Sequence, residues 1–173
     1  MMKRLDIVTI GVSLQQAQEV VQEALVHPLD KLLLPTKYEP YAYEFKPDTN
    51  GISDALDTVN DIRKRDKKDT DFTLVLWDLR QSVAYKVYRL VTSHTNPLTL
   101  AHELGHVLGL EHPSANCNHF AYERKCFSCE HRRNILGCGR GEDGKEFSLN
   151  ECYWSDLDLA KLGFPRDKAE ERR

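Results

Sequence analysis

The spacing of apolar residues divides the chain before residue 92 into short segments of strand and helix. Runs rich in Val, Ile, Leu and aromatic residues are typical of strands, whereas apolar residues three and four apart are typical of an amphipathic helix. The predicted strands are residues 4–12, 38–45, 72–77 and 83–91, and the predicted helices are residues 14–26 and 53–65. This order of elements predicts an α+β domain with helices packed on a mixed sheet.

A further helix is predicted to begin at Asn96. Asn is a favourable N-cap, and Pro97 suits the first helical position, where the missing N–H is not needed. Six apolar residues supply a face that can be buried in a core: Leu98, Leu100, Ala101, Leu104, Val107 and Leu108. Near the C-terminus, Ser155 is predicted to cap a last helix that ends at Gly163.

The helix that starts at Asn96 carries a histidine motif, H-E-x-x-H-x-x-G-x-x-H, over residues 102–112. Residues four apart lie on the same helical face, so His102 and His106 can direct imidazole nitrogens at one metal ion. Glu103 lies beside that ion, where its carboxylate can polarise a bound water. Gly109 can adopt a left-handed conformation, end the helix and return His112 as a third ligand.

Three protein ligands leave the fourth position of a tetrahedral zinc ion open to water, which is typical of a catalytic site. The competing interpretation is a buried amphipathic helix whose histidines are ordinary core residues. The complete five-residue motif favours zinc-assisted hydrolysis.

The long motif resembles that of the metzincin clan of zinc peptidases. The resemblance implies a twisted mixed sheet with packed helices above an active-site cleft, and a small irregular, cysteine-rich lower subdomain that ends in a helix. It implies His102, His106 and His112 as zinc ligands and Glu103 as general base. It also implies that the strand preceding the motif helix is the sheet edge, where an extended peptide could pair.

Clan members carry a methionine in a tight turn below the metal, but the only methionines here are Met1 and Met2. The segment 134–137, Asn-Ile-Leu-Gly, resembles that turn with Leu136 in the methionine position. Leu and Met have similar volumes, so the exchange is tolerable. The motif resembles parts of archaemetzincins, adamalysins and serralysins without assigning a family.

The expected organisation is one catalytic domain over residues 1–165, followed by a charged tail at 166–173. The upper subdomain is predicted to cover residues 1–112 and the lower subdomain residues 113–165. A chain of 173 residues can bury an ordinary core without disulfide support.

All five cysteines follow the motif helix. Cys117, Cys126, Cys129 and Cys138 have the spacing C-x8-C-x2-C-x8-C and could form a second, structural zinc site. Disulfides and unmodified thiols are the alternatives. If Cys138 lies by the catalytic metal instead, His119 and His131 are substitute ligands for the second site.

These features predict a zinc metalloendopeptidase that hydrolyses peptide bonds through a zinc-bound water activated by Glu103. One catalytic Zn²⁺ is expected, and a second, structural one is an open possibility. The alternatives are a non-catalytic zinc-binding interaction domain and, with less support, a metal-dependent endoribonuclease.

The formal net charge of −3 gives no electrostatic basis for binding nucleic acid. No apolar run has the length of a membrane span, and the N-terminus does not resemble a signal peptide. We therefore expect a cytoplasmic protein whose partner is a peptide or protein substrate, with secretion left open.

Overall fold

The computed structural model describes residues 1–42, 64, 71–77, 82–86, 89–113, 131–137, 139–141, 143 and 145–166. The chain forms two compact units, Met1–Val107 and Leu108–Arg173. The first contains a five-stranded sheet, and the second contains turns and short helices. No helix in the described part combines the length and apolar character needed to cross a bilayer.

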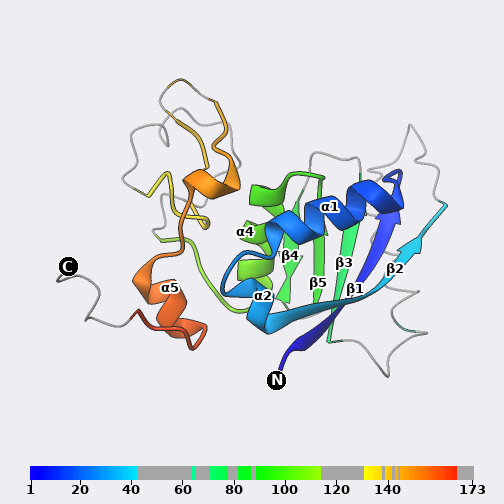
Figure 1. Ribbon diagram of the computed structural model, residues 1–173, viewed down its shortest axis with the longest axis horizontal. Helices are drawn as coiled ribbons and strands as arrows, with labels where there is room; N and C mark the ends of the chain where they lie inside the picture. Colours follow the sequence, from blue (N-terminus) through cyan, green and yellow to red (C-terminus); the bar gives the residue numbers. More distant parts are fainter. Residues whose placement is uncertain are drawn as a thin grey trace. The chain divides into compact units, whose positions relative to one another are not determined.

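The sheet of the first unit has the strand order β2-β1-β3-β5-β4 (Figure 1). Neighbouring strands from β2 to β5 pair in parallel, and the short β4 pairs antiparallel with β5. The strands are β1 Lys3–Ile10, β2 Leu33–Pro40, β3 Phe72–Trp77, β4 Val83–Tyr85 and β5 Leu90–Ser93.

The middle strands of this sheet lie in the core. Leu74, Leu76 and Trp77 of β3 are completely buried, as is Leu5 of β1. A strand covered on both faces reads as a continuous apolar run instead of an alternating one. That pattern explains why residues 72–77 were predicted correctly.

Helix α1, Leu14–Ala24, begins at Ser13, whose hydroxyl accepts a hydrogen bond from the Gln16 N–H at 3.1 Å. Its buried residues, Ala17, Val20, Val21 and Ala24, recur at helical spacing and form one face. A short helix α2, Leu29–Leu32, follows and was not predicted. Helix α1 contacts helix α4, Pro97–Val107, which also contacts β4 and β5 (Figure 1).

The expectation of helices combined with a mixed sheet is confirmed, and the metzincin-like arrangement stays a prediction. Four of the five strands are parallel, and β1 connects to its parallel neighbour β2 through α1 and α2. Such a crossover is an α/β feature. The pattern of apolar residues identified the segments but not their relative directions.

The prediction of one strand over residues 83–91 was wrong. The chain reverses between β4 and β5, and Arg89 adopts a positive φ of 53° in the connection. Apolar residues flank this connection on both sides, so the run looked continuous. The strand that precedes α4 is therefore an inner strand, and β4 is the last strand at that end of the described sheet.

The strand predicted over residues 38–45 overlaps the end of β2, which begins earlier, at Leu33 directly after α2. Residues 43–45 lie outside the described residues. Pro35 and Pro40 are tolerated because β2 is the outermost described strand on its side. The predicted helix at 53–65 lies outside the described residues except for Lys64, which is helical.

The second unit is held by turns, caps and isolated bridges. The bridges are Asn134 with Tyr153 and Arg140 with Glu146. The 3-10 helix η4, Leu149–Glu151, precedes helix α5, Asp156–Lys161. Ser155 caps α5 and Gly163 follows it with φ of +87°, so both predicted ends of the last helix are confirmed.

Candidate metal centre

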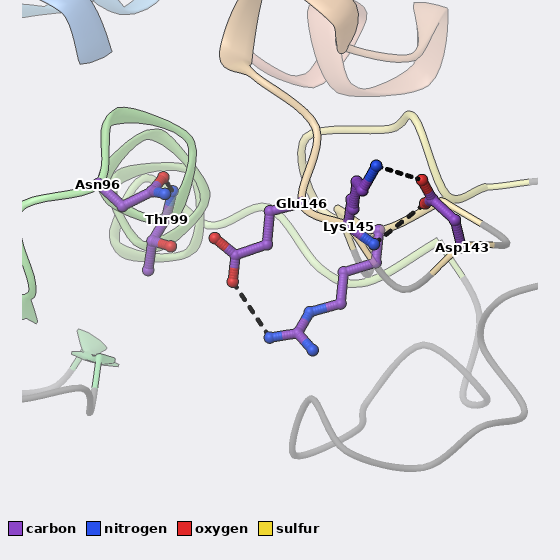
Figure 2. A network of polar contacts seen from close by, with 6 residues as sticks. Asn96, Thr99, Asp143, Lys145 and Glu146 are labelled. Atoms are coloured by element: carbon purple, nitrogen blue, oxygen red, sulfur yellow. Dashed lines mark hydrogen bonds and ion pairs between the residues drawn. The ribbon is translucent and has the colours of Figure 1, made fainter.

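Helix α4 begins as the sequence predicted. The Asn96 side-chain oxygen accepts a hydrogen bond from the Thr99 N–H at 3.1 Å (Figure 2). Leu100, Ala101 and Leu104 are completely buried. Because these apolar residues anchor one side of the helix in the core of the first unit, the direction in which the motif residues project is set.

The end of α4 also matches the prediction. Gly109 has φ of +98°, a conformation that residues with a side chain rarely adopt. No atom lies within 4 Å of the position where a Cβ would stand. The glycine is therefore required by the backbone conformation and not by a lack of space.

His102, His106 and His112 come together. One nitrogen atom of each ring lies within 4.8 Å of those of the other two, and all three residues are half-buried. His102 Nε2 and His106 Nε2 are 3.0 Å apart, and their rings meet edge to face with centroids 4.6 Å apart. Within the described part of the chain, these three histidines are the one cluster of His, Cys, Asp or Glu side chains with the size and spacing needed to hold a metal ion.

The donor set suits zinc. A tetrahedral zinc ion with Zn–N bonds of about 2.0–2.1 Å places its ligand nitrogens roughly 3.3 Å apart. The 3.0 Å separation of His102 Nε2 and His106 Nε2 is close to this value. Imidazole is a preferred zinc ligand, so three imidazoles match the ion in chemistry as well as in spacing.

Glu103 is the buried carboxylate next to the histidines in sequence, with 9% of its surface exposed. Burial raises the pKa of Glu103 from 4.5 to about 7, and a hydrogen bond from the Ala84 backbone acts in the opposite direction. A carboxyl group with a pKa near neutrality can both take up and release a proton at physiological pH. This property is the one required of a general acid–base residue.

In the second unit, residues 134–137 form a tight turn. The Gly137 N–H donates to the Asn134 carbonyl at 2.7 Å. A Cβ on Gly137 would lie 2.1 Å from the His131 carbonyl oxygen, so only glycine fits. Leu136 is completely buried. The sequence singled out this segment, and the structure shows that it is a turn.

The sequence analysis missed the buried Asp158 and the contacts that the Asn134 side chain makes in the second unit. The Asn134 side chain accepts from the Leu136 N–H at 2.8 Å and donates to Asp158 Oδ2 at 3.4 Å. Asp158 in turn accepts from the Ser155 N–H at 3.2 Å. The Ser155-x-x-Asp158 spacing resembles a capping box and could have identified Asp158. Asn134 lies in the turn segment that the sequence singled out, but no signal there pointed to its side-chain contacts.

The proposed cysteine cluster cannot be compared with the structure. Cys117, Cys126, Cys129 and Cys138 lie outside the described residues, as does the substitute ligand His119. His131 is described, and its carbonyl accepts a hydrogen bond from the Asn134 N–H. The second zinc site therefore stays a prediction.

Comparison with known proteins assigns no family. No protein-family model and no curated protein matches the chain. Among solved structures, a chain from "Structure of a chaperone-substrate complex" is similar, with 18% identity and a TM-score of 0.44. The match covers 66% of this chain and spans about a quarter, 27%, of that chain.

Proposed function

We propose that this protein is a zinc-dependent metalloendopeptidase. The observation that carries the proposal is the convergence of three imidazoles within 4.8 Å, two of them on the helix α4 that also bears the buried carboxylate of Glu103. A purely structural site would need no base beside the metal. The combination of an open three-histidine site and a buried base supports hydrolysis.

In this proposal His102, His106 and His112 hold the metal. A bound zinc ion would polarise the scissile carbonyl and make a water molecule more acidic. Glu103 takes the proton from the attacking water and later transfers it to the leaving amine. In the metal-free chain, burial raises the pKa of Glu103 to about 7, which is the direction that favours a proton acceptor.

We further propose a metzincin-like arrangement. Support comes from the helix α4, the left-handed Gly109 after it, and the tight turn in which buried Leu136 takes the methionine position. A cysteine-bound second zinc, a cytoplasmic location and a peptide or protein substrate belong to the same proposal. An extended peptide could pair with β4, the last strand of the described sheet on that side.

The deciding experiment compares wild type with Glu103→Gln on an unfolded protein such as casein, after loading both with zinc. We expect Glu103→Gln to keep its zinc and to lose cleavage by about 10²–10⁴-fold, the usual contribution of general base catalysis. EDTA should abolish wild-type cleavage, and added zinc should restore it. The exposed Glu23→Gln on α1 is the matched control and should keep full activity.

The same assay separates the other functions. Full cleavage by Glu103→Gln would contradict the role of the base. RNA degradation without proteolysis would favour the endoribonuclease. Zinc binding without either activity would favour a non-catalytic interaction domain.

A further inference from the structure

The main chain at Ala84 is unusual because it interacts with a side chain of α4. Ala84 pairs with Val91 in the antiparallel ladder of β4 and β5, and its backbone also forms a hydrogen bond with Glu103. A carboxylate only accepts, so the Ala84 N–H is the donor. An N–H that donates to a side chain is not used in the ladder.

The alternation of an antiparallel ladder then fixes the direction of this peptide group. Opposed residues alternate between pairs that exchange two hydrogen bonds and pairs that exchange none. Because the Ala84 N–H donates to Glu103, the pair of Ala84 and Val91 is one that exchanges no hydrogen bonds. The Ala84 N–H therefore points away from β5. Because β4 is the last described strand on this side, the N–H lies at the outer edge of the sheet.

Glu103 is thus held from two sides. Its backbone belongs to α4, which contacts both β4 and β5, and its carboxylate meets the edge of β4. Only 9% of Glu103 is exposed, so few other orientations are open to the side chain. A general base works well only when its orientation toward the proton is fixed.

We propose that the main-chain N–H of Ala84 is a positioning group that fixes the carboxylate of Glu103 for its reaction. The inference rests on the proposed function, because it assigns to Glu103 the role of base. Ala84 touches neither substrate nor metal in this scheme. It acts through Glu103, and its own side chain plays no part.

Ala84→Pro is the sharpest variant, because proline lacks the N–H. At a sheet edge, proline is tolerated where the N–H faces outward, so the ladder with β5 is kept. We expect unchanged zinc content, an unchanged KM, and a kcat lowered by about ten- to a hundredfold, within the usual contribution of general base catalysis. Ala84→Gly keeps the donor and is the matched control, with an expected kcat within about twofold of wild type.

A double-mutant cycle distinguishes positioning from a general structural role. In a Glu103→Ala background, Ala84→Pro should have no further effect on the residual rate. An equal loss of kcat in both backgrounds, or an unchanged kcat in Ala84→Pro, would overturn the proposal.

A second measurement needs neither activity nor the proline variant. In the metal-free protein, the Ala84 amide proton should resonate downfield in wild type and move upfield in Glu103→Ala. The Leu90 amide, in the neighbouring hydrogen-bonded pair, is the reference and should move little. An unmoved Ala84 signal would refute the hydrogen bond, whereas an inactive wild type with a moved signal would refute the proposed function.

Discussion

The two units of this chain are stabilised by different interactions. In Met1–Val107, the sheet and the helices α1 and α4 bury continuous apolar surface, and every residue of β3 after Phe72 is buried. In the described part of Leu108–Arg173, the buried apolar residues are Leu110, Ile135, Leu136, Trp154 and Leu159. There the turns are joined by side-chain hydrogen bonds such as the one between Asn134 and Asp158, and by the ion pair of Arg140 with Glu146. Figure 2 shows a second ion pair of this unit, between Asp143 and Lys145.

The comparison shows how each unit is stabilised. The first unit supplies a rigid platform for His102, Glu103 and His106, because α4 is anchored by buried residues. The described part of the second unit depends on the geometry of individual polar groups. Substitutions should therefore act through lost apolar volume in the first unit and through lost hydrogen bonds in the second.

The largest effect is expected from Leu76→Ala. Leu76 is completely buried at the centre of the sheet, so truncation leaves a cavity. We expect the free energy of unfolding to fall by roughly 2–5 kcal/mol, as measured by urea denaturation. The exposed Leu14→Ala is the control and should change stability little. Similar losses for the two variants would contradict the picture of a packed apolar platform.

The buried carboxylate of the first unit should make its stability depend on pH. The folded pKa of Glu103 is about 7, against 4.5 for an unperturbed group. Below pH 4.5 the Glu103 carboxyl group is neutral in both the folded and the unfolded state, so its burial does not lower the free energy of unfolding through ionisation. As the pH rises toward 7, the unfolded chain releases the proton first, so stability falls, by on the order of 3 kcal/mol in total.

This pH dependence is tested in the metal-free protein, by comparing denaturation of wild type and Glu103→Gln from pH 4 to 8. The amide is neutral throughout, so the advantage of the variant should grow between about pH 4.5 and 7 and then level off. A constant difference across this range would show that Glu103 titrates normally.

A smaller effect is expected from Asn134→Ala in the second unit. The variant leaves the Leu136 N–H without its acceptor and removes a donor to Asp158. We expect a loss of about 1–3 kcal/mol, the cost of unsatisfied buried polar groups. The exposed Asn150→Ala is the control. If both variants unfold at the same urea concentration, the buried hydrogen bonds of Asn134 do not stabilise this unit.

The smallest effect is expected when the N-cap serine of one helix in each unit is replaced by alanine. Ser13 and Ser155 each accept a hydrogen bond from a backbone N–H of their helix, at 3.1 and 3.2 Å. Replacement by alanine should cost about 1 kcal/mol in both cases. Ser155→Ala should cost more than Ser13→Ala, because Ser155 also donates to the buried Asp158. Thermal denaturation of the two variants tests this order.

The sequence by itself determined the local features. Asn96, Pro97 and Gly109 define the limits of the motif helix, and the spacing of His102 and His106 places them on one face. Ser155 and Gly163 define the last helix in the same way. These features depend on interactions among residues close in sequence, so they can be predicted without knowledge of the fold.

Only the tertiary structure decided the features that join distant residues. The parallel strand order, the reversal between β4 and β5 and the position of β4 at the sheet edge depend on pairing between segments far apart in sequence. The same is true of the Asn134–Asp158 contact and of the hydrogen bond from Ala84 to Glu103. Periodicity records which face of a segment is buried, but it contains no information about the partner that buries it.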